Sequence, residues 1–181
     1  PRRLVLLDIS EPALYQVGIE IAEHVERLAA GVQMQQLPDI VSVLGSVRDE
    51  ALLTRTIRAN GIETIYHAAA YKHVPLVEHN PVTGIANNTF GTAVLAETAQ
   101  RLGVERVVLI STDKAVRPTN IMGASKRLAE LIFQAAAAEP ATTTVFTMVR
   151  FGNVLDSSGS VVRRFRKQIE AGGPVTVTHP D

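Results

Sequence analysis

Cysteine and tryptophan are absent from this 181-residue sequence, and neither sign of charge is in excess, since 18 Lys and Arg residues balance 18 Asp and Glu residues. The lack of cysteine excludes disulfide bonds, thiolate zinc sites and cysteine nucleophiles, and leaves a reducing cytoplasm as the expected compartment. The lack of net charge provides no positive field for nucleic acid or an anionic membrane. No apolar run approaches the ~20 residues that span a bilayer. We therefore expect one globular domain with no nucleic-acid partner and no membrane segment of its own.

Short apolar runs rich in Val, Ile and Leu alternate with longer amphipathic segments. Continuous apolar runs of this kind are typical of strands buried on both faces of a parallel sheet. Strands are expected at residues 4–8, 40–44, 64–68, 107–111 and 145–149, and helices at residues 12–30, 49–60, 81–102 and 122–138. This alternation predicts an α/β fold with a doubly wound, Rossmann-like parallel sheet.

The glycine-rich turn of dinucleotide-binding folds is also absent, because no G-x-G-x-x-G string occurs. That turn follows the first strand of such a fold and holds a pyrophosphate. If residues 4–8 form the second strand, the first β-α unit would precede Pro1, so the sequence reads as a fragment of a larger protein. Beyond Phe151 the pattern changes to a Ser/Gly loop, a helix at 161–171 and a short strand at 175–177.

The densest group of reactive side chains is the string STDKAVRPTNIMGASK at residues 111–126, which leaves a buried strand and enters a helix. Ligands of open α/β sheets bind at the carboxyl ends of strands. Thr112, Asp113 and Lys114 supply a hydroxyl, a carboxylate and an amine in consecutive positions, and Lys126 lies one turn after Met122. An exposed ion pair and a solvated lysine would explain each residue singly, but not the whole string.

Asp8 ends the first apolar run, where a dinucleotide-binding domain places an acidic side chain on the adenosine ribose hydroxyls. There it would favour NAD over NADP, because it would repel the additional phosphate. An aspartate that opens a turn or caps the next helix beside Ser10 explains the same pattern.

Three segments together carry a resemblance to a known family. The string at 111–126, HAAAYKHVPLVE at 67–78, and VRFGNVL at 149–155 followed by SSGSV at 157–161 are similar to extended short-chain dehydrogenase/reductases, specifically the polysaccharide-biosynthesis (CapD-type) nucleotide-sugar 4,6-dehydratases. The resemblance covers nearly the whole chain. It implies an NAD-binding Rossmann-like domain over residues 1–150, incomplete at its N-terminus, and the start of a nucleotide-sugar-binding region over residues 151–181.

The resemblance implies a lyase that uses NAD to dehydrate a UDP-N-acetylhexosamine, most typically UDP-N-acetylglucosamine, for surface polysaccharide or glycan biosynthesis. Most extended reductases have a catalytic Tyr where this sequence has Met122, whose thioether cannot exchange a proton. Lys114 would take the C5 proton of the sugar and Asp113 would protonate the departing C6 hydroxyl. Thr112 would hydrogen-bond the C4 oxygen, and Lys126 would hold the nicotinamide ribose.

By the same resemblance, further residues would line the cofactor or the substrate. Asn88 could also be an ordinary polar helix residue, and Lys72 and His73 could belong to an ordinary solvated loop. Small side chains let the backbone approach a cofactor, while an Arg fork and hydroxyls suit a diphosphate. Those assigned to NAD, with Lys126, are Asp8, Ser46, Val47, Ala68, Ala69, Ala70, Lys72 and Asn88. Those assigned to the nucleotide-sugar are Lys72, His73, Arg150, Asn153, Ser157 and Ser158.

Two positions depart from the family pattern. Ser46 stands where the family commonly has an Asp near the adenine, and its hydroxyl can still hydrogen-bond. Asp156 stands where the family usually has Gly before the Ser/Gly run. Its negative charge should weaken binding of a diphosphate unless the side chain points away.

Two other functions are compatible with the residues. A nucleotide-sugar 4-epimerase would share the fold, the cofactor and oxidation at C4, although the Asp113–Lys114 pair favours elimination. A non-catalytic nucleotide-binding module would retain only the fold, although the intact Thr112 and Lys126 argue against this. The five histidines show no metal-ligand spacing and no G-x-S-x-G elbow occurs, so we assign neither a metal nor a hydrolytic triad.

Activity, location and association are expected from the resemblance alone. The 181 residues by themselves should be inactive, because they lack the pyrophosphate turn and part of the sugar-binding region. Family members often carry membrane helices that would anchor the parent protein with its catalytic domain in the cytoplasm. Helices corresponding to 81–102 and 122–138 commonly pair in a homodimer of this superfamily, but here they could equally only cover the sheet.

Overall fold

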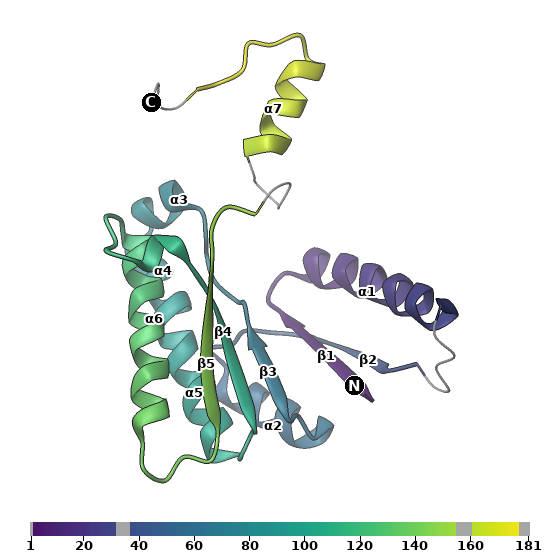
Figure 1. Cartoon of the computed structure of the whole chain (residues 1–181), viewed down its shortest axis with the longest axis vertical. Coiled ribbons are helices and arrows are strands. Elements are labelled where there is room, and N and C mark those ends of the chain that lie inside the picture. Colours follow the sequence, from purple (N-terminus) through teal and green to yellow (C-terminus); the bar gives the residue numbers. More distant parts are fainter. Residues whose placement is uncertain (1, 32–36, 155–160, 178–181) are drawn as a thin grey trace.

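The computed structural model describes residues 2–31, 37–154 and 161–177 (Figure 1). Strands and helices alternate along them, as predicted. The strands are β1 (Arg3–Asp8), β2 (Asp39–Leu44), β3 (Thr64–His67), β4 (Arg106–Thr112) and β5 (Val145–Phe151). The α-helices are α1 (Glu11–Gly31), α2 (Glu50–Asn60), α3 (Val74–His79), α4 (Pro81–Ile85), α5 (Gly91–Arg101), α6 (Ile121–Ala138) and α7 (Val161–Glu170). A π-helical segment, η1 (Ala86–Phe90), joins α4 to α5, and a 3₁₀ turn, η2 (Asp113–Ala115), follows β4.

All paired strands are parallel, which confirms the predicted α/β class, but within the described residues they form two sheets. β1 pairs with β2, while β4 lies between β3 and β5. In the predicted doubly wound order, β1 and β3 would be separated by the strand of the first β-α unit. No strand of the described residues occupies that position, so no ladder joins the two sheets.

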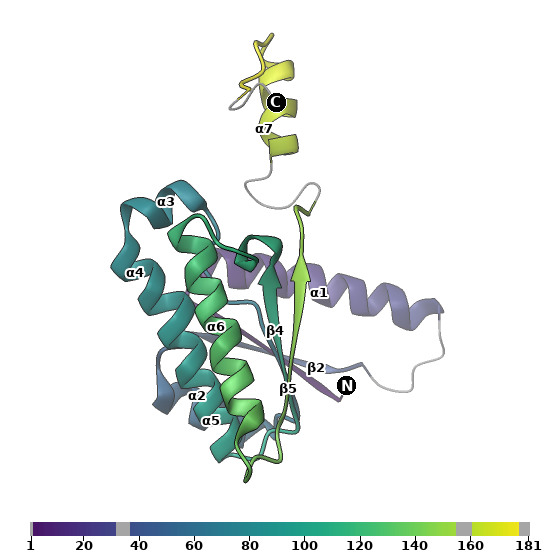
Figure 2. The same cartoon turned by 60° about the vertical axis from the view of Figure 1, so that its left-hand side comes forward.

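Helices cover one face of the three-stranded sheet. Figures 1 and 2 show α2, α5 and α6 together on that side, while α1 lies apart from them, along β1 and β2. Alternate residues of β4, such as Val107 and Leu109, point into this layer and are fully buried. The ring of Phe133 packs edge-on against Phe146 of β5, with 5.2 Å between centroids. The buried members of this core are Leu53, Ile57, Leu95, Ala96, Ala99, Val104, Val107, Leu109, Ala129 and Phe133.

The prediction that the strands are buried on both faces is wrong for most of them in this structure. Val145 and Val149 of β5 are exposed, and β1 and β2 are only partly buried. The apolar runs correctly located the strands, but burial of a second face also requires an element packed over it. No such element lies over the exposed side of β5 among the described residues.

Local structure differs from prediction in three further places. The expected helix at 81–102 is interrupted by η1, and α3 precedes it in a segment for which no element was predicted. The expected strand at 175–177 is wrong, because no strand is present there. Instead, Gln168 of α7 accepts a hydrogen bond from the Thr176 backbone at 3.1 Å and donates to its hydroxyl at 2.7 Å. A side chain thereby takes the backbone hydrogen bond that a neighbouring strand would need.

Candidate functional site

The predicted reactive residues meet at the carboxyl end of β4. Thr112 ends the strand, and its hydroxyl donates to the Asp113 carboxylate at 2.9 Å. The Lys114 ammonium donates to the same Asp113 oxygen at 3.1 Å and to the side-chain oxygen of Asn153 at 3.0 Å. Asn153 follows β5, which lies directly beside β4. The structure therefore brings Thr112, Asp113, Lys114 and Asn153 into one hydrogen-bonded group.

This group contains an ion pair that is open to water. Hydrogen bonds from Lys114 and then Thr112 lower the pKa of Asp113 below the ordinary value of an aspartate. The side chain of Asp113 is 54% exposed and that of Lys114 is 36% exposed. The pair consequently rests as carboxylate and ammonium and contributes little to stability.

Lys126 is different, because it is buried. Its ammonium donates to the backbone carbonyl of Ile110 on β4 at 2.8 Å. Burial lowers the pKa of Lys126 to about 8, and the neighbouring Glu130 carboxylate partly offsets this effect. Met122 lies buried one turn earlier on α6. The predicted cofactor lysine is thus held against the strand that carries the reactive group.

The start of α6 is fixed against this strand by two caps and a close backbone contact. Asn120 accepts a hydrogen bond from the Gly123 backbone at 2.8 Å, and Glu78 of α3 accepts one from the Ile121 backbone at 2.5 Å. A Cβ atom at Gly123 would clash with the carbonyl oxygen of Lys114. Only glycine allows α6 to approach Lys114 so closely.

Asn88 connects the segment after β3 to α6. It is buried in the π-helical segment, accepts a hydrogen bond from the Tyr71 backbone at 2.7 Å and donates to the Tyr71 carbonyl at 3.0 Å. It also donates to the Ser125 hydroxyl at 3.0 Å. A π-helical turn inserts an extra residue and so redirects the side chains that follow it. Asn88 therefore ties the segment at 68–73 to α6, and its assignment to the cofactor stays a prediction.

Glu130 is a residue that the sequence reasoning missed. It is fully buried on α6, where its carboxylate accepts two hydrogen bonds from the Arg150 guanidinium, at 2.8 and 2.7 Å. Ser111 and Arg127 donate to it at 2.7 and 2.8 Å. These bonds, those from Arg150 first, lower the pKa of Glu130 to about 2 against the opposing effect of burial. The sequence did place a Glu one turn after Lys126, on the helix face that also carries Met122, Ala129 and Phe133.

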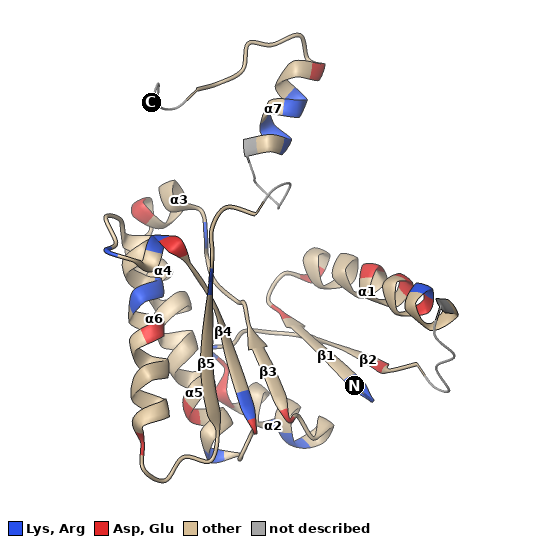
Figure 3. Cartoon of the chain, in the orientation of Figure 1, with Lys and Arg blue, Asp and Glu red and all other residues tan. Residues whose placement is uncertain are grey.

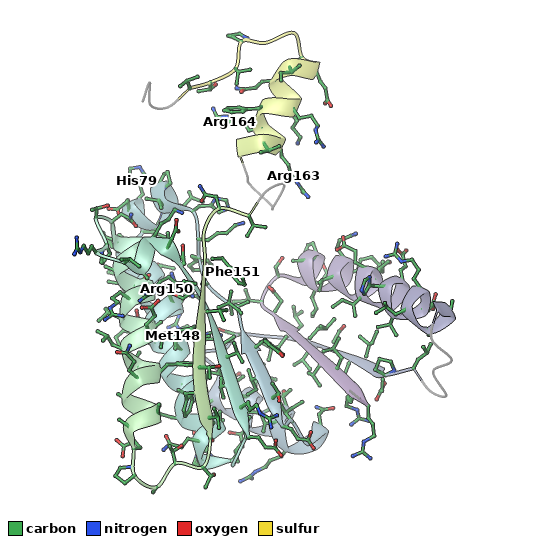
Figure 4. All side chains as sticks on the ribbon, in the orientation of Figure 1. His79, Met148, Arg150, Phe151, Arg163 and Arg164 are labelled. Atoms are coloured by element: carbon green, nitrogen blue, oxygen red, sulfur yellow. The ribbon has the colours of Figure 1, made fainter. Side chains whose placement is uncertain are left out.

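Arg150, predicted to bind the diphosphate, therefore directs two guanidinium N–H groups to Glu130. It lies on the side of β5 that faces α6, near the end of the strand (Figure 4). Its side chain remains 41% exposed. Both signs of charge lie along α6 and at the end of β4 (Figure 3). The pairing with Glu130 thus explains the position of the Arg150 guanidinium without any substrate. Substrate binding by Arg150 stays a prediction.

A second buried group missed as a site neighbour is His67. Its Nε2 lies 2.9 Å from the Thr92 hydroxyl. Burial lowers the pKa of His67 to about 3, and the positive charge of Lys126 contributes to this shift. His67 is therefore neutral near pH 7 and belongs to the surroundings of Lys126.

The residues assigned to the cofactor lie at the carboxyl ends of other strands. Asp8 ends β1 and accepts a hydrogen bond from the Ser10 backbone at 2.7 Å, so the turn that was its alternative explanation is present. Ser46 accepts one from the Arg48 backbone at 3.2 Å, and Val47 is buried. The assigned residues that follow β3 are exposed or partly buried: Ala68, Ala69, Ala70, Lys72 and His73.

Three residues discussed from the sequence, Ser157, Ser158 and Asp156, lie outside the described residues. Within the described ranges, no group of three or more His, Asp or Glu side chains could hold a metal ion. None of the helices described is both long and apolar enough to cross a bilayer.

Comparison with known proteins places the whole chain in one group. The family model described as polysaccharide biosynthesis protein matches residues 1–181. The chain is 42% identical, over 181 residues, to the capsular polysaccharide biosynthesis protein CapD of Staphylococcus aureus, and covers 28% of that protein. It is 38% identical over 139 residues to the inverting UDP-N-acetylglucosamine 4,6-dehydratase of Campylobacter jejuni, with 75% of the chain and 41% of the relative covered.

An epimerase is among the relatives as well. The chain is 38% identical over 144 residues to the UDP-glucose 4-epimerase of Rickettsia canadensis, with 79% of the chain and 42% of the relative covered. The chain thus spans less than half of each of these three proteins.

Solved structures agree on the fold. The structure of Pen from Bacillus thuringiensis is similar over 99% of the chain and 52% of that protein, with a TM-score of 0.85 and 30% identity. DesIV, a dTDP-glucose 4,6-dehydratase of Streptomyces venezuelae, is similar over 96% of the chain and 54% of that protein, with a TM-score of 0.72 and 22% identity. At that identity the second likeness shows the fold alone.

Proposed function

Because the chain belongs to the polysaccharide biosynthesis protein family, we propose that it carries the reactive centre of an NAD-dependent enzyme that dehydrates a UDP-N-acetylhexosamine, UDP-N-acetylglucosamine in the first instance. The observation that carries this proposal is the hydrogen-bonded group of Thr112, Asp113, Lys114 and Asn153. It lies on the strand that also holds Lys126. Residues 1–150 would bind the cofactor and residues 151–181 would begin the sugar-binding region.

The Asp113–Lys114 ion pair holds the one transferable proton that elimination needs, but on the amine instead of on the carboxyl. A base at C5 requires a neutral amine, and an acid at the C6 hydroxyl requires a protonated carboxyl. Moving one proton from the Lys114 nitrogen to the Asp113 oxygen, along their 3.1 Å hydrogen bond, creates both forms. A bound sugar that excludes water favours this neutral pair, because desolvation raises the pKa of a carboxyl and lowers that of an amine. The C5 proton then passes to Lys114, and the C6 oxygen leaves as water with the Asp113 proton.

The residues present fit the nicotinamide cofactor. Ala68, Ala69 and Ala70 follow β3 with the smallest side chains that carry a Cβ, so a flat ring can approach the backbone there. The buried Lys126 ammonium can donate to a ribose hydroxyl while it stays close to β4. NAD, when bound, supplies the hydride acceptor at C4 and the donor that returns the hydride to C6. Oxidation at C4 also releases the C4 hydroxyl proton, which the Met122 thioether cannot accept. Thr112, whose hydroxyl donates to Asp113, would hydrogen-bond the C4 oxygen while that proton passes to solvent.

Epimerisation at C4 is the second candidate, supported by the epimerase relative. It requires neither a base at C5 nor an acid at C6, so it leaves the Asp113–Lys114 pair without a task. The two reactions differ in their products, because dehydration loses one water and epimerisation leaves the mass unchanged.

The first experiment is mass spectrometry of UDP-N-acetylglucosamine incubated with NAD and the complete gene product that contains this chain. We expect loss of one water and, in deuterated water, incorporation of one deuterium at C5. Lys114→Ala should abolish both. Arg106→Ala, at the opposite end of β4, is the matched control and should retain both. An unchanged mass with inversion at C4 would establish epimerisation, and nucleotide binding with no change in the sugar would indicate a binding module.

A further inference from the structure

The Glu130 carboxylate joins three secondary-structure elements in a fully buried position. It belongs to α6, Ser111 belongs to β4, and Arg150 belongs to β5. Ser111 and Arg150 are direct neighbours in the parallel register of these strands. One acceptor therefore fixes the carboxyl ends of two adjacent strands to each other and to the helix. Arg127, one turn away on α6, adds a fourth donor but no further element.

Each of these elements also supplies a residue of the candidate site. Lys114 follows Ser111 by three residues, and Asn153 follows Arg150 by three. Among the residues described, their contact at 3.0 Å is thus the next side-chain hydrogen bond between these two segments beyond the Glu130 cluster. Lys126 lies one helical turn before Glu130, and its ammonium donates to Ile110, the residue next to Ser111.

Charge gives Glu130 a second effect on the same site. If the carboxylate is removed, the Arg127 and Arg150 cations that pair with it remain without that partner. A second titratable group that interacts with Lys126 is the neutral His67 from β3. Glu130 is therefore the one buried anion, among the residues described, that stabilises the Lys126 ammonium.

We propose that Glu130 is a positioning residue: by tying β4, β5 and α6 together, it sets the spacing at which Lys114 meets Asn153 and holds Lys126 against the Ile110 carbonyl. Its catalytic consequence rests on the proposed dehydration. Its effect on Lys126 does not, because that effect arises from charges within the chain. The competing explanation is an ion cluster that only stabilises the fold.

Three variants of the complete gene product separate these explanations. Glu130→Gln removes the charge, Glu130→Asp keeps the charge but shortens the reach, and Arg127→Gln removes a partner that does not link α6 to a strand. The readouts are the thermal midpoint, kcat and KM for water loss, and the pKa of Lys126. The last is followed by NMR of ¹³Cε-labelled lysine and assigned with Lys126→Arg.

Glu130→Gln should lower the pKa of Lys126 below its value of about 8, since an opposite charge is lost. Both Glu130 variants should lower kcat by about 10- to 100-fold with little change in KM, because the reacting groups are displaced. Glu130→Asp should leave the Lys126 titration near its original value. Arg127→Gln should change kcat by less than about 3-fold and should not lower the pKa of Lys126.

The proposal is overturned if the Glu130 variants lower only the thermal midpoint, or if Arg127→Gln reproduces their effects. If Glu130→Gln does not fold, normal kcat in a folded Glu130→Asp protein would reject the positioning role. If the unsubstituted protein dehydrates no sugar, the proposed function fails, while the Lys126 titration still decides the electrostatic part of the inference.

Discussion

The two sheets of this chain are built from equally apolar strands but are stabilised to different extents. The β3-β4-β5 sheet rests on a helical layer with a continuous core and a buried ion cluster. In the β1-α1-β2 unit, Leu14 is the one hydrophobic residue of the described positions that is fully buried. Leu28 and Tyr15 of α1 remain exposed, and Leu7 is the residue of β1 that packs against the core. Apolar sequence therefore locates a strand, whereas its stability depends on what covers it.

The largest difference should come from the buried ion cluster. Glu130→Ala leaves the Arg150 guanidinium and the Ser111 hydroxyl without their acceptor, and should lower the free energy of unfolding by about 3–5 kcal/mol. The exposed pair of Arg3 and Asp39, which joins β1 to β2, is the comparison. Asp39→Asn should cost at most about 1 kcal/mol. Urea denaturation measures both, and equal losses would contradict the contrast between the two regions.

Core packing should show the same contrast. Leu109 is fully buried in the centre of the three-stranded sheet, so Leu109→Ala should cost about 2–5 kcal/mol through lost burial and a residual cavity. Leu28 is 52% exposed on α1, and Leu28→Ala should change stability by less than about 0.5 kcal/mol. The same denaturation curves test this pair of variants. A cost at Leu28 comparable to that at Leu109 would show that another element covers α1 in solution.

Acid should destabilise the β3-β4-β5 sheet through protonation of His67, which ends β3. Burial lowers the pKa of His67 in the folded chain to about 3, against an ordinary value of 6.5, so between these values only the unfolded chain gains the proton. The free energy of unfolding should fall by about 1.6 kcal/mol between pH 6.5 and pH 5 for this residue alone. His67→Gln removes the titration but can keep a hydrogen bond to Thr92. Denaturation at several pH values should therefore show a shallower fall for the variant, and identical slopes would reject the shift.

The sequence located most of the candidate site, because an apolar run placed residues 111–126 at the end of β4. It could not predict the contact of Lys114 with Asn153, which depends on the register of β4 against β5. It missed Glu130 because a glutamate on a helix reads as solvent-exposed unless its distant partners Ser111 and Arg150 are known. Local patterns predicted the elements, while contacts between residues far apart in sequence determine the charge distribution of the site.

The smallest effects compare two helical glycines, one in each region. A Cβ atom at Gly123 of α6 would clash with the Lys114 carbonyl, so Gly123→Ala should cost about 1–3 kcal/mol and lower activity by moving Lys114. A Cβ atom added at Gly18 of α1 would lie 3.7 Å from the Ser42 hydroxyl oxygen, which is an ordinary van der Waals contact. Gly18→Ala should therefore stabilise the chain by about 0.5–1 kcal/mol, because alanine loses less conformational freedom in a helix. Thermal midpoints that move in opposite directions would show that packing around a glycine, and not its helical position, decides the sign.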